Sequence, residues 1–364
     1  MNYYVIAGEA SGDLHGSNLI KALSELDPEL NIRAWGGDLM EAAGAHIVKH
    51  YRDLAFMGFV EVLMNIRTIT KNLKFCKKDI ADYKPDALIL IDYPGFNLRM
   101  AKYAKSLGIP VHYYISPTVW AWKSSRVNQI KSDVDQLFCI LPFEPEFYKT
   151  FGYETTYVGH PLLDSIDENE LKSVKENQNT PYIALLPGSR VQEIKALLPV
   201  MVEVTKAFPE YEFKLAVAPS LSLDFIKSYT ANTSITLVEN ATHQVLKHAT
   251  LALVTSGTAT LETALFNTPE IVCYKTSTIS YWIGRMLVKV KYICLVNLIF
   301  DKEVVPELIQ HQCTSKALIQ HTKALLSGEK RKSMLADYKN LKHLLGQGGA
   351  SKNVAKAIHQ FHQN

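Results

Sequence analysis

The chain has 364 residues, of which 47% are hydrophobic and 21% are charged, and its 39 Lys and Arg residues nearly balance 36 Asp and Glu residues. This composition excludes a disordered or collagen-like chain, and a net charge of +3 gives no support for a nucleic-acid partner. The length predicts about two domains, and the five cysteines, none in a CxxC pair, indicate buried thiols in a reducing compartment.

Strand and helix signals alternate through the first half of the chain. The predicted strands lie at residues 3–7, 32–35, 87–91, 111–115 and 136–141, and the predicted helices at 14–26 and 98–107. The run at 87–91 is apolar throughout, which is typical of a strand buried on both faces of a parallel sheet. The alternation therefore predicts a doubly wound α/β domain.

The same alternation restarts after a polar, hinge-like stretch at 164–180. The predicted strands here lie at 182–186, 212–218, 235–238, 251–254 and 270–274, with a helix at 193–208. A short last helix places Val354, Ile358 and Phe361 on one face, so it is expected to dock on the amino-terminal domain or on a partner subunit. We expect domains at 1–165 and 166–345, a cleft between them, and a crossover helix at 346–364.

The amino terminus begins with a strand signal and lacks the basic and apolar regions of a secretory leader. The chain also contains no apolar run of about 18 residues, so no helix is expected to span a membrane. Both observations predict a cytoplasmic protein.

The first candidate site is the loop after the first predicted strand, because ligands bind at the carboxyl ends of strands in open parallel sheets. It contains Glu9, Ser11 and Asp13, and its glycines and helix-terminal N–H groups suit an anion. The loop lacks the GxGxxG spacing and the GK[ST] sequence, so a dinucleotide cofactor and ATP hydrolysis are disfavoured. A tight turn without a ligand is the alternative interpretation.

The second candidate is Asp92, which directly follows the apolar run at 87–91 and precedes a Pro-Gly turn. A carboxylate at the end of a parallel strand is well placed to act as a general base, a role that contributes about 10²–10⁴ in rate. A turn-forming or helix-capping Asp is an equally good interpretation from the sequence alone.

The third candidate is the loop of Gly188, Ser189 and Arg190, which joins a predicted buried strand to a helix. Its N–H groups and the arginine are expected to converge on a diphosphate, because the planar guanidinium binds phosphate oxygens in pairs. An exposed loop arginine without a ligand is the alternative.

The fourth candidate repeats this arrangement with Ser256, Gly257 and Thr258 at another helix start. Glu262 lies one turn into that helix, where its carboxylate is expected to accept hydrogen bonds from ribose hydroxyls. A solvated acid on a helix face is the alternative.

Two further stretches combine apolar and basic residues. Residues 56–66 are unusually apolar and are followed by Arg67, Lys71 and Lys74, which suits reversible attachment to an anionic bilayer. Residues 281–289 mix aromatic with basic residues, and for them a core helix is the favoured interpretation. The histidines show no metal-ligand spacing, so we expect no metal.

Taken together, five ordered motifs resemble those of the lipid-A-disaccharide synthase family. They are GEASGD at 8–13, IDYPGFN at 91–97, SPTVWAW at 116–122, LPGSR at 186–190 and SGTA at 256–259. The resemblance extends over nearly the full chain, and the set is far more specific than any one motif.

The resemblance implies a GT-B glycosyltransferase with two Rossmann-like domains facing a cleft, working without a cofactor in lipid A biosynthesis. It implies transfer of 2,3-diacylglucosamine from UDP-2,3-diacylglucosamine to the 6-hydroxyl of 2,3-diacylglucosamine 1-phosphate. The products would be the β-1′,6-linked disaccharide 1-phosphate and UDP. It further implies a monomer or swapped homodimer, peripherally attached to the cytoplasmic side of the inner membrane.

The resemblance also assigns roles to particular residues. The implied acid–base residue is Asp92. The implied UDP-sugar-binding residues are Gly188, Ser189, Arg190, Ser256, Gly257, Thr258, Glu262 and Asn297. The implied acceptor or cleft residues are Glu9, Ser11, Asp13 and Trp120, and the implied membrane contacts are Met57, Phe59, Val60, Leu63 and Met64. Many members carry Asp-Ala-Pro-Asp where this chain has Asp-Tyr-Pro-Gly at 92–95, so the second acid of that motif is absent here.

Two alternatives stay open at this point. One is another GT-B enzyme acting on a UDP-sugar, such as a 2-epimerase or a peptidoglycan-precursor glycosyltransferase. The other is a non-catalytic two-domain binding protein, which the lack of a leader signal disfavours.

Overall fold

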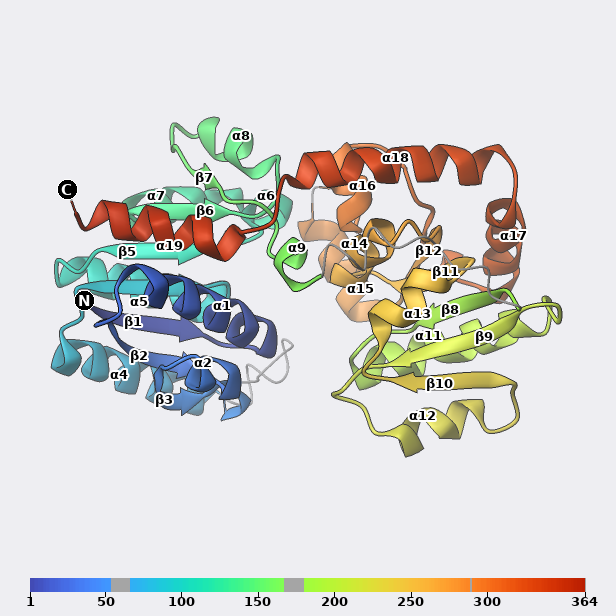
Figure 1. The fold of residues 1–364 in the computed structure, drawn as a ribbon, viewed down its shortest axis with the longest axis horizontal. Coiled ribbons are helices and arrows are strands. Elements are labelled where there is room, and N and C mark those ends of the chain that lie inside the picture. Colours follow the sequence, from blue (N-terminus) through green and yellow to red (C-terminus); the bar gives the residue numbers. More distant parts are fainter. Residues whose placement is uncertain (54–65, 167–179, 289, 364) are drawn as a thin grey trace. The chain divides into compact units, whose positions relative to one another are not determined.

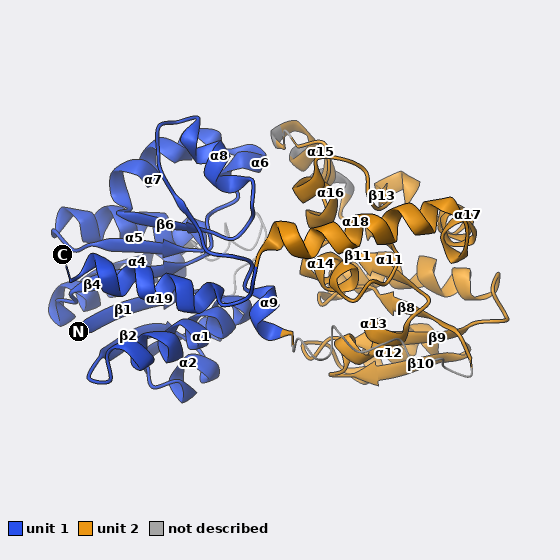
Figure 2. Ribbon diagram, turned by 45° about the horizontal axis from the view of Figure 1, so that its top comes forward, with its two compact units in different colours: residues 1–165, 347–364 blue, residues 166–346 orange. Residues whose placement is uncertain are grey.

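The computed structural model describes residues 1–53, 66–166, 180–288 and 290–363. The chain forms two compact units, the first from residues 1–165 and 347–364 and the second from residues 166–346 (Figure 2). These boundaries differ by one residue from the domain limits expected from the sequence.

Unit 1 is built on a seven-stranded parallel sheet with the strand order β3-β2-β1-β4-β5-β6-β7 (Figure 1). Its strands are β1 (Asn2–Ala7), β2 (Asn31–Gly36), β3 (His46–His50), β4 (Ala87–Ile91), β5 (Val111–Tyr114), β6 (Gln136–Cys139) and β7 (Thr156–Tyr157). The central strand β4 is buried over its whole length, as its apolar sequence predicts.

Helices cover both faces of this sheet, as the alternation of strand and helix signals predicts. They are α1 (Ala10–Leu26), α2 (Asp38–Ala42), α4 (Ile66–Tyr83), α5 (Pro94–Ser106), α6 (Val119–Trp122), α7 (Val127–Asp133), α8 (Glu144–Lys149), α9 (Leu162–Ser165) and α19 (Ala350–Phe361). Successive residues of β4 point to opposite faces, so Leu88 and Leu90 join the core beneath α4, α5 and α7. Ile89 and Ile91 join the core beneath α1 and α19 on the other face.

The carboxyl-terminal helix α19 packs against α1 in unit 1, where Val354 and Ile358 are fully buried. The Asp164 carboxylate accepts hydrogen bonds from the backbone N–H groups at the start of α19, including those of Ala350 and Ser351, both at 3.3 Å. The last helix therefore returns to the amino-terminal domain, the first of the two docking places expected from its apolar face.

Unit 2 repeats the design with a six-stranded parallel sheet in the order β10-β9-β8-β11-β12-β13. Its strands are β8 (Tyr182–Leu186), β9 (Glu212–Val217), β10 (Ile235–Glu239), β11 (Leu251–Thr255), β12 (Glu270–Tyr274) and β13 (Glu307–Ile309). Its helices are α11 (Val191–Thr205), α12 (Leu223–Thr230), α13 (Thr242–His248), α14 (Thr258–Leu265), α15 (Thr278–Leu287), α16 (Leu295–Phe300), α17 (Ser315–Leu326) and α18 (Glu329–Leu345). The expected pair of doubly wound α/β domains is confirmed.

Candidate active site

Asp92 lies at the tip of β4 in a constrained backbone turn. Asp92 and Tyr93 both have left-handed backbone angles, with φ of 45° and 48°, which cost about 1–3 kcal/mol each. The turn is held by the Asp92 carbonyl, which accepts hydrogen bonds from the Asn97 amide at 2.7 Å and from the Tyr113 hydroxyl at 2.5 Å. These bonds hold the backbone that carries the Asp92 side chain.

The surroundings of Asp92 favour the neutral carboxyl. Burial is the main cause, the negative charge of Glu9 adds to it, and together they raise the pKa of Asp92 to about 6. A carboxylate with a pKa near neutrality is better matched to proton abstraction than one with the usual low value. The structure therefore brings Glu9 and Asp92, two residues predicted separately, into one electrostatic environment.

The residues after β1 divide into two groups. Ser11 is exposed in the first turn of α1, which begins at Ala10 and so earlier than predicted, and Glu9 is the residue just before this helix. Asp13 is only 2% exposed, and its carboxylate accepts hydrogen bonds from the N–H groups of Gly37 at 2.7 Å and Met40 at 3.1 Å. The Asp13 oxygens therefore anchor the start of α2, and the expectation that Asp13 belongs to the acceptor or cleft loop stays a prediction.

Trp120 is positioned by a buried acid that the sequence interpretation missed. Its indole N–H donates to Glu144 Oε1 at 3.1 Å, and Glu144 Oε2 accepts from the N–H groups of Ile140 and Leu141 at 3.1 and 3.0 Å. Burial raises the pKa of Glu144 to about 7, although these hydrogen bonds oppose the shift. Glu144 follows a predicted strand and precedes a proline, a signal typical of a helix start that could have identified it.

In unit 2, the backbone conformation of the loop after β8 requires a glycine at position 188. Gly188 has φ of 117°, and a Cβ placed there would lie 2.2 Å from Glu193 Oε2. That oxygen accepts hydrogen bonds from the N–H groups of Ser189 at 3.0 Å and Arg190 at 3.2 Å. In this structure Glu193 accepts both N–H groups, and the expectation that they bind a diphosphate stays a prediction.

The Arg190 side chain, in contrast, is available. It is 64% exposed, and its guanidinium lies 3.6 Å from Glu193 Oε1, a loose ion pair between residues three apart. Exposed pairs of this kind contribute little, so the guanidinium can turn to an anionic ligand at small cost. Its exposure keeps Arg190 as the candidate phosphate contact of this loop.

The loop after β11 offers a second anion-binding feature. Gly257 and Thr258 are exposed at the start of α14, while the Ser256 hydroxyl donates to the Ile293 carbonyl at 3.2 Å. Half-buried Glu262 lies one turn along α14; burial raises its pKa, and the positive charge of His243 opposes this. The helix start suits an anion, and Glu262 provides an acceptor beside it.

Asn297 is fully buried, and its side-chain amide forms hydrogen bonds with backbone groups of unit 2. Its Oδ1 accepts from the N–H groups of Val304 at 2.7 Å and Val305 at 3.0 Å. Its Nδ2 donates to the Val305 carbonyl at 2.9 Å and to Glu307 Oε1 at 2.8 Å. Asn297 thus holds the segment that leads into β13 in place, and its expected role as a UDP-sugar contact stays a prediction.

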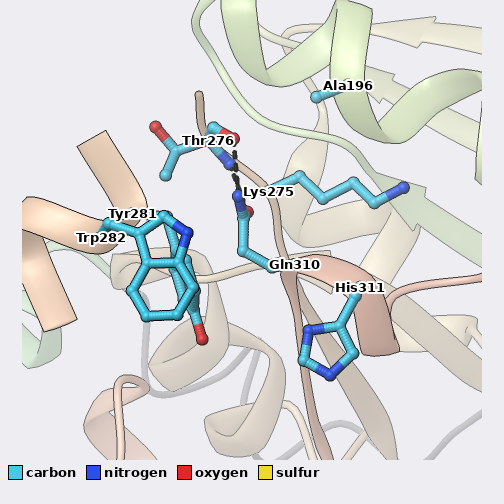
Figure 3. Close-up of a pocket in the computed structure, with 7 residues that line it drawn as sticks. All are labelled: Ala196, Lys275, Thr276, Tyr281, Trp282, Gln310 and His311. Carbon is cyan, nitrogen blue, oxygen red and sulfur yellow. Dashed lines mark hydrogen bonds between the residues drawn. The ribbon is translucent and has the colours of Figure 1, made fainter. Parts of the chain in front are cut away.

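A cavity of about 490 Å³ opens where β12 and β13 end (Figure 3). It is lined by Ala196, Lys275, Thr276, Tyr281, Trp282, Gln310 and His311. The Gln310 side chain bonds both backbone groups of Thr276, accepting from its N–H and donating to its carbonyl at 2.8 Å each. The rule that ligands bind at strand ends could have identified Lys275, which directly follows β12.

Three further expectations concern metals and membranes. Among the described residues, no group of His, Cys, Asp and Glu side chains is placed to hold a metal ion. The helices in that part of the chain include none long and apolar enough to cross a bilayer. The expected membrane contacts Met57, Phe59, Val60, Leu63 and Met64 lie outside the described residues.

Comparisons with known proteins identify the family of the chain and solved structures that share its fold. A family model described as lipid-A-disaccharide synthetase matches residues 3–361. The lipid-A-disaccharide synthases of Myxococcus xanthus (strain DK1622) and Syntrophus aciditrophicus (strain SB) are 38% and 40% identical. The first alignment covers 97% of this chain and 96% of the relative, and the second covers 96% and 95%.

Solved structures with the same fold are more distant in sequence. A UDP-GlcNAc 2-epimerase from Neisseria meningitidis bound to UDP-GlcNAc has a TM-score of 0.67 at 12% identity, with both chains covered completely. A glycosyltransferase of kitacinnamycin has a TM-score of 0.68 at 14% identity, covering 99% of this chain and 98% of that one. At such identities the likeness shows the fold alone.

Proposed function

The chain belongs to the lipid-A-disaccharide synthase family, and from this membership we propose how its residues carry out the transfer. It is a hexosyltransferase that moves 2,3-diacylglucosamine from UDP-2,3-diacylglucosamine to the 6-hydroxyl of 2,3-diacylglucosamine 1-phosphate. The products are lipid A disaccharide 1-phosphate and UDP. A 2-epimerase or peptidoglycan-precursor activity is not favoured, because the structural likeness to epimerases extends to the fold only.

Asp92 takes the proton from the acceptor. As the 6-hydroxyl oxygen forms its bond to the donor C1, its proton passes to the Asp92 carboxylate, and the C1–oxygen bond to UDP breaks with inversion. The single observation that carries this proposal is the half-buried Asp92 carboxyl at the tip of β4, where its surroundings raise its pKa to about 6. Gly95 stands where many family members have a second acid, so the proposed mechanism uses one carboxylate at this turn.

The departing UDP carries negative charge, which unit 2 is suited to stabilise. We assign the diphosphate to the exposed Arg190 guanidinium and to the start of α14 at Gly257 and Thr258. Glu262 is assigned to ribose hydroxyls. Ser11 and Glu9 are kept as candidate contacts of the acceptor, whereas Asp13 and Asn297 support the backbone.

The acylated substrates require access to lipid. We propose that residues 57–64 attach the protein peripherally to the cytoplasmic surface of the inner membrane, as the apolar sequence there suggests. Replacing Met57 and Leu63 by serine should shift the protein from liposomes to the supernatant. Unchanged partitioning would contradict this part of the proposal.

The reaction itself is tested by supplying both substrates and identifying the product by mass spectrometry. The proposal expects the acylated disaccharide 1-phosphate and UDP in equal amounts. Absence of the disaccharide, with epimerisation or transfer from unacylated UDP-GlcNAc in its place, would overturn it.

A further inference from the structure

Helix α15 of unit 2 exposes large apolar side chains. Trp282 is 57% and Met286 is 76% exposed, and Val288, just after the helix, is also exposed. Trp282 and Met286 are four residues apart, so they lie on one face of the helix. The favoured sequence interpretation of 281–289 as a core helix is therefore wrong for these side chains, and an exposed apolar patch of this kind marks an interaction surface.

The sequence segment that contains this patch carries only positive charges. From residue 271 to residue 300 the sequence contains no Asp or Glu and carries its cations at Lys275, Arg285, Lys289 and Lys291. Arg285 is exposed beside Met286, and its guanidinium donates to the Tyr281 hydroxyl at 2.8 Å. Lys291 lies 3.2 Å from Asp301, which offsets part of its charge. The remaining positive charge complements an anionic surface.

Hydrogen bonds hold the chain segment just before α15. The two hydrogen bonds between Gln310 and Thr276 fix the chain just before α15. Figure 3 shows Tyr281 and Trp282 on one side, His311 on the other, and Gln310 between them. Trp and Tyr combine an apolar ring with a polar group, which is why they gather at the boundary between water and lipid.

We propose that the α15 surface, defined as Trp282, Arg285, Met286 and Val288, binds the anionic face of a lipid bilayer. The apolar side chains enter the headgroup region, and Arg285 lies among lipid phosphates. This contact is separate from the one assigned to residues 57–64. It goes beyond the proposed reaction, because it requires neither donor nor acceptor.

The experiment is flotation of the full chain with vesicles of phosphatidylcholine, with and without phosphatidylglycerol, in the absence of substrates. Lipid is set so that half of the wild-type protein binds. The double variant Trp282→Ser with Met286→Ser should bind about tenfold more weakly. The matched control is Leu344→Ser on α18, which removes an apolar side chain that is 42% exposed in the same unit, and it should bind as wild type.

A charge variant tests the second half of the proposal. Arg285→Gln should weaken vesicle binding about fivefold, and only when phosphatidylglycerol is present. The control Lys339→Gln, at an exposed position of α18, should leave vesicle binding unchanged. Circular dichroism and thermal denaturation verify that each variant is folded. Equal binding of the double variant and the Leu344→Ser control would overturn the proposal. So would a wild-type dimer that the double variant dissociates while vesicle binding stays unchanged, since a second copy would then cover α15.

Discussion

Replacing Asn297 by alanine should destabilise the protein while leaving UDP contacts intact. The substitution removes the acceptor of two buried backbone N–H groups, those of Val304 and Val305. An unsatisfied buried donor costs about 1–3 kcal/mol, so the two together should lower the free energy of unfolding by roughly 2–6 kcal/mol. This is a large share of the roughly 5–15 kcal/mol that stabilises a typical protein.

Urea denaturation followed by circular dichroism measures the effect. With an m-value of about 2 kcal/mol/M, the midpoint of the affected transition should fall by roughly 1–3 M. The control is Asn353→Ala in unit 1, which removes one hydrogen bond, to the Val158 carbonyl, and should cost about 0.5–1.5 kcal/mol. The reasoning is refuted if Asn297→Ala keeps its denaturation midpoint but loses affinity for UDP, because Asn297 would then be a ligand contact.

Two further substitutions probe the loop after β8. Arg190→Ala should weaken UDP binding by roughly 10–150-fold in calorimetry, as expected for the loss of a charge-assisted contact. The control Lys206→Ala, at the end of α11, should leave the affinity for UDP unchanged. Equal affinities of the two variants would show that Arg190 does not bind the phosphates. Gly188→Ala should lower the free energy of unfolding by about 1–3 kcal/mol, because φ is 117° and the new Cβ would meet Glu193. Gly257→Ala, where a Cβ meets nothing within 4 Å, is its control in thermal denaturation, and equal stabilities would contradict this account of the loop.

The sequence predicted the strands that have neighbours on both sides. The bounds of β4, β8 and β12 agree with the predicted runs, because strands inside a parallel sheet are covered on both faces and are mostly apolar. Among the described strands, β3, β7 and β13 were not predicted and all lie at sheet edges, whereas β10, also at an edge, was predicted. Edge strands face solvent on one side and need no continuous apolar run, so their sequences carry a weak signal.

The candidate site was predicted less completely, because its details depend on contacts between distant residues. The position of Asp92 follows from its place after an apolar run, but its raised pKa depends on burial by the fold and, to a smaller extent, on Glu9, which is far away in sequence. The bonding of Asp13 to the chain after β2 also cannot be derived from a motif. A polar residue in a loop motif can form hydrogen bonds with the backbone as readily as with a ligand, and only the fold distinguishes these two roles.

The most direct test of the central claim is the pH dependence of kcat/KM for the wild type and for Asp92→Asn. If Asp92 takes the acceptor proton, the wild-type value should fall about tenfold per pH unit below an apparent pKa near 6. The variant should lose this limb and at least about a hundredfold in turnover while still binding UDP. Glu144→Gln, which removes another carboxyl of raised pKa among the described residues of unit 1, should keep the limb. A near-normal rate in Asp92→Asn, or an unchanged acidic limb, would contradict the account.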